Sequence, residues 1–229
     1  MPSPPVSAEP AVLPDPGRPR ARTALVLLSA ASGAADAFVF LCLGQVFAGV
    51  MTGNLVLLGA SAAGAGESGT APRVVAALVS YGCGVAGAAW VGGRTAGRLP
   101  VMLLTEVALL SAGAVLWACG LVASEADRLG LLVAMGLAMG IQARIRDTPT
   151  NYFTGTLTSL VGRLARGTRR HGDGWVLARL AAVVAGAGGA ALTVRLWPAG
   201  GASAAAVLAA AAVLVEAAGR SGVRAEGDR

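Results

Sequence analysis

Long apolar runs separated by short polar stretches follow one another along the whole chain after residue 22. Most of them approach the ~20 residues that a helix needs to cross the hydrocarbon core of a bilayer. Backbone groups in lipid must be hydrogen-bonded internally, so runs of this length indicate helices rather than barrel strands. The pattern predicts an all-α, polytopic transmembrane helix bundle. The runs cover residues 24–43, 47–63, 74–91, 101–122, 129–141, 152–164, 176–196 and 202–217.

The second half of the chain resembles the first at a displacement of 102 residues. Met-Thr-Gly-Asn-Leu at 51–55 resembles Phe-Thr-Gly-Thr-Leu at 153–157. One displacement shared by several runs indicates two homologous halves, an arrangement found in many transporters, whose sites lie between the halves. The halves extend over about 24–122 and 126–218. The same displacement carries 74–91 onto 176–193 and 101–115 onto 203–217.

The number of spans decides how the halves are related, because three spans per half give an inverted repeat and four give a parallel one. The runs that contain Thr-Gly, 47–63 and 152–164, are the ambiguous ones. Arginines flank the second on both sides, which suggests that it enters and leaves on one face. We therefore predict six full spans plus two short or re-entrant Thr-Gly helices, with eight spans as the alternative.

Loop arginines orient this layout, because they accumulate on the cytoplasmic side. With a cytoplasmic N-terminus, six spans leave fewer arginines outside than eight spans do. The six-span layout leaves Arg73, Arg128 and Arg195 outside, and the eight-span layout leaves Arg94, Arg98, Arg144, Arg146 and Arg195.

Composition agrees with a membrane protein, since 55% of the residues are hydrophobic and only 13% are charged, against ~25% charged in soluble domains. The net charge of +6 comes entirely from arginines that lie mostly between apolar runs, so we expect membrane lipids and no nucleic acid as partners.

The Pro-rich segment 1–22 is predicted to be a disordered tail. Residues 23–218 form a single transmembrane domain, and 219–229 form a polar C-terminal tail.

An acidic residue, Asp36, lies inside the first apolar run. Ser29, Ser32, Gly33 and Asp36 are spaced i, i+3, i+4 and i+7, which places them on one helical face. A charge at this depth is costly, so Asp36 is a candidate for binding a proton, a cation or a substrate. The alternative is a structural hydrogen-bonding role. Both interpretations stay open.

Glu106 lies about one turn inside its run, so we expect its side chain to reach the interface, with a binding role as the secondary interpretation. Arg179, Arg195 and Glu216 lie near the ends of runs and are interpreted as interface residues.

The Thr-Gly segments supply uncharged oxygens and amides at equivalent places in both halves. Glycine permits unwound backbone, and free backbone groups at membrane depth can hold an ion or polar solute. The alternative is close helix packing, because Gly49 to Gly53 and Gly136 to Gly140 fit the GxxxG pattern. The predicted substrate or ion site contains Asp36, Thr52, Gly53, Asn54, Gln142, Thr154, Gly155 and Thr156.

Residues for catalysis are scarce, and we expect neither an enzyme nor a bound cofactor or metal. There is one histidine, His171, and the three cysteines lack metal-ligand spacing. We therefore expect a transporter or permease for a small solute or cation, with a non-transporting assembly or accessory protein as the alternative. A homo-oligomer is compatible with either.

The acid-containing segment 33–38, followed by 47–54 with Met-Thr-Gly-Asn, resembles the YoaK-like family of uncharacterised bacterial integral membrane proteins. Gln142 and the second Thr-Gly segment, 152–157, strengthen the resemblance, which covers most of 23–217. One departure is Ala143, where the family tends to have Asn. The resemblance implies a bundle of about six helices in the inner (plasma) membrane and implies no activity.

Overall fold

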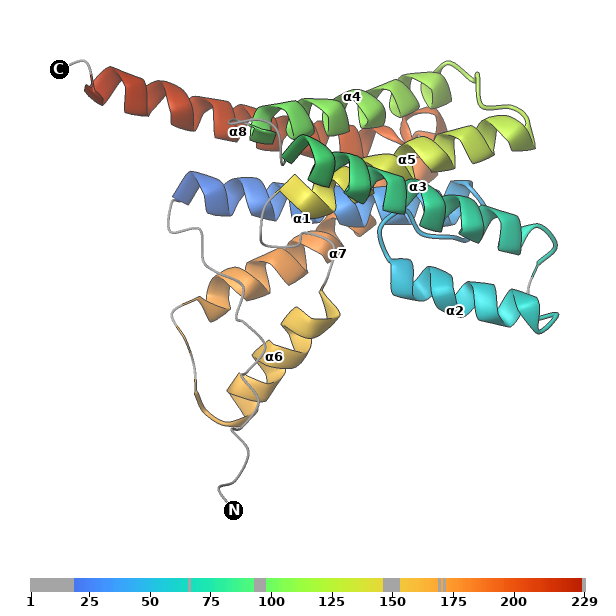
Figure 1. Ribbon diagram of the computed structural model, residues 1–229, viewed down its shortest axis with the longest axis horizontal. Helices are drawn as coiled ribbons and strands as arrows, with labels where there is room; N and C mark the ends of the chain where they lie inside the picture. The colour runs from blue at the N-terminus through green and yellow to red at the C-terminus, as the bar shows by residue number, and fades with distance from the viewer. Residues whose placement is uncertain are drawn as a thin grey trace.

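The computed structural model describes residues 19–65, 67–92, 98–145, 153–168, 170 and 172–227, and within them the chain is helical without strands. The predicted all-α bundle is confirmed (Figure 1). Most of the predicted N-terminal tail and His171 lie outside the described residues. The helices are α1 (Pro19–Cys42), α2 (Met51–Ala62), α3 (Thr70–Gly92), α4 (Arg98–Ala118), α5 (Glu125–Ile145), α6 (Thr154–Ala165), α7 (Asp173–Leu196) and α8 (Ser203–Gly227), with a 3-10 turn at Pro198–Gly200.

Long and short helices separate clearly by length. Five of the described helices, α1, α3, α4, α5 and α7, are long and apolar enough to cross a membrane. α8 has 25 residues but a shorter apolar part, Ser203–Ala218, and α2 and α6 have 12 residues each. Twelve residues extend ~18 Å, well short of a ~30 Å hydrocarbon core. The described helices are therefore six long and two short, and five of the long ones are candidate spans.

Successive long helices alternate in direction along the bundle (Figure 1). At one end, Arg73 of α3 pairs with Glu125 of α5, and Trp117 of α4 donates a hydrogen bond to the carbonyl of Pro198 before α8. At the other end, Arg20 of α1 lies against the Ala218 carbonyl of α8. α2 lies beside the first end and α6 beside the second. Equivalent short helices thus lie at opposite ends.

The centre of the bundle is α1, which packs mainly against α7 and α8. Its closest approach to α7 uses small residues, because a Cβ on Gly33 would strike the carbonyl of Val183, and a Cβ on Gly186 that of Ala30. Small residues of this kind allow helix backbones to approach closely in lipid.

The contact between α3 and α5 repeats this arrangement. A Cβ on Gly84 would strike the carbonyl of Leu137, and a Cβ on Gly140 would strike that of Tyr81. Gly84 and Gly186 are 102 residues apart, the displacement seen in the sequence. The two helix pairs α1–α7 and α3–α5 are therefore built alike.

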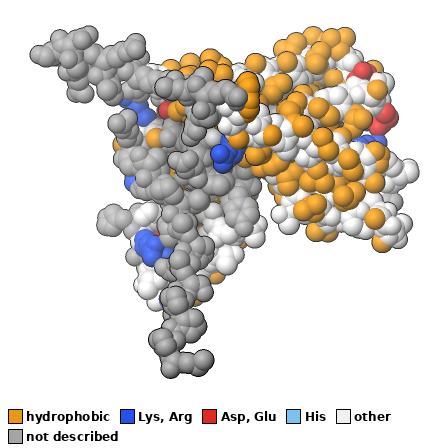
Figure 2. All heavy atoms as spheres, in the orientation of Figure 1, with side chains coloured by type: hydrophobic (Ala, Val, Ile, Leu, Met, Phe, Trp, Pro, Cys, Tyr) orange, Lys and Arg blue, Asp and Glu red, His pale blue; other side chains and the backbone are white. Residues whose placement is uncertain are grey.

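The outer surface of the bundle is apolar. Figure 2 shows hydrophobic side chains spread over the long helices on the visible face. Large apolar side chains are exposed on several of these helices, including Leu104, Val115, Val184, Leu192, Val207 and Leu214. Such an extensive apolar surface is unfavourable in water and suits a lipid environment.

Candidate functional site

The polar face predicted on α1 lies in the interior of the bundle. Ser29, Ser32, Gly33 and Asp36 are all buried, and the Asp36 residue is 8% exposed. Their 3-4-7 spacing aligns them on the side of α1 that the other helices cover. The residues of this face nevertheless meet different partners.

Asp36 binds the backbone of the loop that leads from α1 to α2. One carboxylate oxygen, Oδ1, accepts a hydrogen bond of 2.7 Å from the N–H of Gly49, and the N–H groups of Ala48 and Val50 also face the carboxylate. α2 begins directly after Val50 and has no side-chain cap of its own. A negative charge beside the unpaired N–H groups of a helix start is favourable. Asp36 therefore holds the loop directly before α2 and places its negative charge near the start of that helix.

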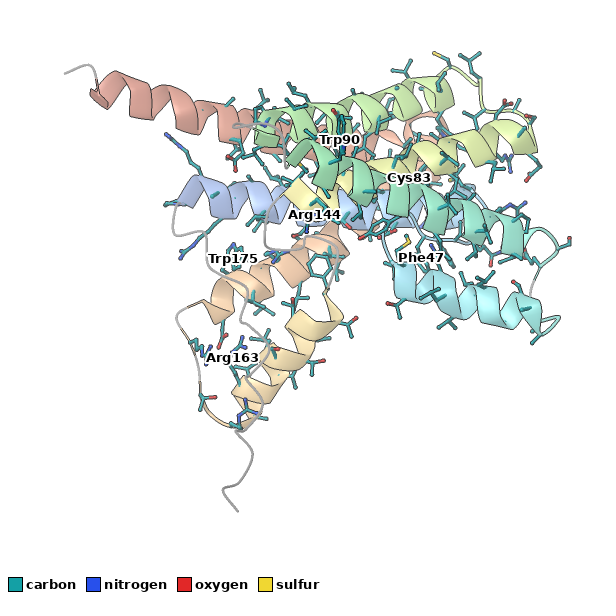
Figure 3. The ribbon with its side chains drawn as sticks, viewed as in Figure 1. Phe47, Cys83, Trp90, Arg144, Arg163 and Trp175 are labelled. Atoms are coloured by element: carbon teal, nitrogen blue, oxygen red, sulfur yellow. The ribbon has the colours of Figure 1, made fainter. Side chains whose placement is uncertain are left out.

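Asn54 holds the same loop through a second pair of hydrogen bonds. Its Oδ1 accepts from the N–H of Phe47 at 2.9 Å, and its Nδ2 donates to the carbonyl of Phe47 at 2.8 Å. Gly53 lets the Phe47 ring lie close, since a Cβ there would be 3.1 Å from the ring atom Cε2 (Figure 3). Thr52 is exposed. We call the contacts of Asp36, Gly53 and Asn54 with this loop the α2 clamp.

A second polar group joins α1, α5 and α7 deeper in the bundle. Gln142 donates from Nε2 to the carbonyl of Leu28 at 2.8 Å. Arg179 donates from Nε to Ser29 Oγ at 3.2 Å, and that hydroxyl donates to the Leu25 carbonyl at 2.7 Å. We call Ser29, Gln142 and Arg179 the central cluster.

The prediction that Arg179 is an interface residue is wrong, because the residue is only 1% exposed. Its guanidinium carbon lies 5.4 Å from the ring centre of Phe153 and 5.1 Å from that of Trp175. Cation–π contacts of this kind stabilise a guanidinium away from water. The signal that sequence reasoning missed is the spacing of Trp175 and Arg179, four residues apart on one helical face.

Glu106 is fully buried, and neither carboxylate oxygen has a hydrogen-bond partner among the described residues. The expected interfacial position is therefore wrong. α4 begins at Arg98, which places Glu106 about 12 Å along the helix, and the side chain is too short to reach back to the end. The helices that pack most extensively against α4 are α5 and α8.

The second Thr-Gly segment forms the start of α6, where Thr154 is exposed, Gly155 is half-buried and Thr156 is buried. α6 is joined to α7 by a buried ion pair in which Arg163 Nη2 and Nε lie 2.6 and 3.0 Å from Asp173 Oδ1 (Figure 3). The other oxygen, Oδ2, accepts from the backbone N–H of Arg170 at 2.9 Å. Arg163 and Asp173 thus form an internal ion pair, because α6 folds back onto the start of α7.

The predicted site residues form three separate sets. Asp36, Gly53 and Asn54 belong to the α2 clamp, Gln142 belongs to the central cluster, and 154–156 lie on α6. Leu28, which binds Gln142, precedes Asp36 by eight residues, or ~12 Å along α1. The structure does not gather all of the predicted residues around one point. The described residues include no group of three His, Cys, Asp or Glu side chains that could hold a metal ion.

Comparisons with known proteins agree with a membrane protein. Residues 24–218 match the family described as "Protein of unknown function (DUF1275)". A similar protein is the UPF0700 transmembrane protein YoaK of Bacillus subtilis (strain 168), 33% identical over 147 residues, which are 61% of this chain and 65% of that protein. No solved structure matches the chain. The YoaK-like resemblance is thereby confirmed, and the chain is a membrane protein that belongs to the DUF1275 family of unknown function.

Proposed function

We propose that this membrane protein is a transporter or permease for a small solute or ion. The observation that carries the proposal is the burial of three ionisable side chains, Asp36, Glu106 and Arg179, within long apolar helices. Ionisable side chains are costly inside a bilayer and therefore rare there. Those that are present usually mark ion or substrate pathways and proton relays. The proposal includes no enzymatic activity.

The position of the central cluster supports a path between two halves of the chain. Its hydrogen bonds join α1 of the first half to α5 and α7 of the second half. Each half has the order long, short, long, long, and α1 and α5 run in opposite directions (Figure 1). We infer that the halves, about 24–122 and 126–218, are an inverted repeat. Transporters of that kind bind substrates where their repeats meet.

Arginine placement supports a cytoplasmic N-terminus in the inner (plasma) membrane. The end of the bundle beside α6 carries more arginines than the end beside α2, and short cytoplasmic loops are rich in arginine. The arginines at the end beside α6 include Arg20, Arg144, Arg163, Arg166 and Arg170. Those at the end beside α2 include Arg73, Arg128 and Arg195.

The test begins with the thermal stability of the purified protein in detergent. Amino acids, sugars, nucleosides and inorganic cations are added one at a time, and each solute that raises the melting temperature is tested for uptake into proteoliposomes. A bound solute stabilises the folded state by mass action. We expect uptake by the native protein to be about tenfold faster than by Gln142→Leu, equivalent to ~1.4 kcal/mol. Trp197→Phe, at the exposed end of α7, is the control.

A specific observation favours a second candidate, a non-transporting assembly or accessory protein. Asp36 and Asn54, two of the polar residues predicted to bind a ligand, make their hydrogen bonds to backbone groups of their own half. This candidate predicts that no solute in the panel raises the melting temperature or crosses the bilayer. A solute that does both excludes it.

A further inference from the structure

Glu106 differs from the other buried acids in having no donor beside it. Asp36 accepts from Gly49, and Asp173 binds Arg163 and the N–H of Arg170, whereas both oxygens of Glu106 lack a partner among the described residues. A buried carboxylate without a donor or counter-charge is very unfavourable, so this group is expected to gain a neutralising ligand.

The helix register places Glu106 within about one helical turn of Gln142 in the central cluster. Gly113 of α4 faces Leu131 and Met135 of the antiparallel α5, since a Cβ at Gly113 would lie 2.7 Å from the Leu131 Cδ1 and 3.2 Å from the Met135 Cε. Glu106 is seven residues before Gly113, and Ala138 and Gln142 are seven residues after Leu131 and Met135. Seven residues are two turns, so Glu106 faces α5 between the levels of Ala138 and Gln142.

From Gln142, hydrogen bonds link α5 to α1 and α1 to α7. Gln142 binds the carbonyl of Leu28 on α1, and the next residue, Ser29, accepts from Arg179 on α7. The charged residues on the packed helices include Arg144, two residues after Gln142 on α5, Arg179 on α7 and Glu216 on α8, while Asp36 lies ~12 Å away from Leu28 along α1. Arg179 is the cation whose side chain is held in the central cluster.

We infer that Glu106 is a proton-binding residue, which takes up one proton as a neutral acid and releases it as a carboxylate during the working cycle. A proton is favoured over a metal ion because α4 is a continuous helix around Glu106, so its carbonyls are occupied by helical hydrogen bonds. The described acidic, histidine and cysteine side chains also offer no cluster for a metal. The inference rests on the proposed transport function and assigns its coupling ion.

The role in transport follows from charge balance. With its proton, Glu106 is uncharged and can remain buried in the packed bundle. Without it, the carboxylate needs water or a positive charge, so proton release requires helices to separate or Arg179 to approach. Protonation would thereby favour one packing of α4, which is how an ion gradient biases a two-state protein.

Labelling with dicyclohexylcarbodiimide in lipid nanodiscs tests the inference without a known substrate. The reagent modifies protonated carboxyl groups in apolar surroundings, and mass spectrometry locates the adduct. We expect an adduct on Glu106 that forms more slowly as pH rises and at an unchanged rate when sodium or potassium chloride is added. Glu106→Gln should lose this adduct, and Glu67→Gln, at an exposed loop position, should retain it.

Absence of the Glu106 adduct, or a labelling rate that depends on sodium or potassium rather than on pH, would overturn the proton assignment. Flux in proteoliposomes separates the two proposals. If the native protein moves no solute but Glu106 labels as expected, the transporter proposal fails and the proton site stands. If Glu106→Gln transports with an unchanged pH dependence, the transporter stands and the proton site fails.

Discussion

The two short helices, α2 and α6, hold equivalent places in the two halves, yet different interactions attach them to the bundle. α2 is fixed by hydrogen bonds in the preceding loop, where Asp36 accepts from the Gly49 N–H and Asn54 accepts from and donates to the backbone of Phe47. α6 is fixed by the ion pair between Arg163 and Asp173. The α2 clamp thus depends on loop conformation, whereas α6 depends on one pair of charges. Substitutions in the α2 clamp and in the α6 ion pair should therefore loosen opposite ends of the protein independently.

The largest effect should come from breaking the α6 ion pair. Arg163→Ala leaves Asp173 without its main partner, and losing one member of an ion pair inside the protein is destabilising. We expect faster hydrogen exchange throughout α6 and little change in α2. Arg166→Ala, at the exposed end of α6, is the matched control. Unchanged exchange in α6 would show that other contacts hold the helix.

Asn54→Ala should loosen the opposite end of the bundle. The substitution removes two partly buried hydrogen bonds to the backbone of Phe47, and a backbone group left unpaired inside the protein costs up to about 1–3 kcal/mol. Hydrogen exchange should increase in loop 43–50 and in the first turn of α2, with α6 unaffected. Thr52→Ala changes an exposed neighbour and should have almost no effect. Equal responses from both variants would contradict the α2 clamp.

Alanine at the glycine contacts compares the two long-helix pairs. Gly186→Ala and Gly84→Ala each introduce a Cβ against a backbone carbonyl, and overpacking of this kind costs about 1–3 kcal/mol. We expect both to lower the melting temperature by similar amounts. Gly188→Ala and Gly87→Ala, where a Cβ meets open space, should not. A large effect in only one pair would argue against their structural equivalence.

The smallest effect is expected from Asp36→Asn. The amide oxygen can still accept from Gly49, so mainly the favourable interaction of the charge with the start of α2 is lost, about 0.3–1 kcal/mol. Asp36→Leu removes the acceptor as well and should lower the melting temperature further. If Asn and Leu were equally destabilising, the charge rather than the hydrogen bond would be the essential feature.

Run lengths and residue spacing were enough to predict the long helices and the buried face of α1. They predict which side of a helix is covered but not what covers it. The partner of Asp36 is loop backbone, and backbone groups carry no distinctive sequence signal. Glu106 was misplaced because α4 starts at Arg98 rather than at the first apolar residue, 101, which puts the acid deeper. Arg179 was misplaced because the rings around it come from two elements.

The central position of α1 has a consequence for biosynthesis. α1 is made first, but its main neighbours, α7 and α8, emerge from the ribosome about 150 residues later. Until then Ser29 lacks its contact with Arg179, and the side of α1 that includes Gly33 has no close packing partner. A helix left in this state inserts alone but assembles late, because its native contacts are distant in sequence. We expect nascent chains arrested before residue 173 to remain bound to the insertion machinery, which site-specific crosslinking from position 33 would detect.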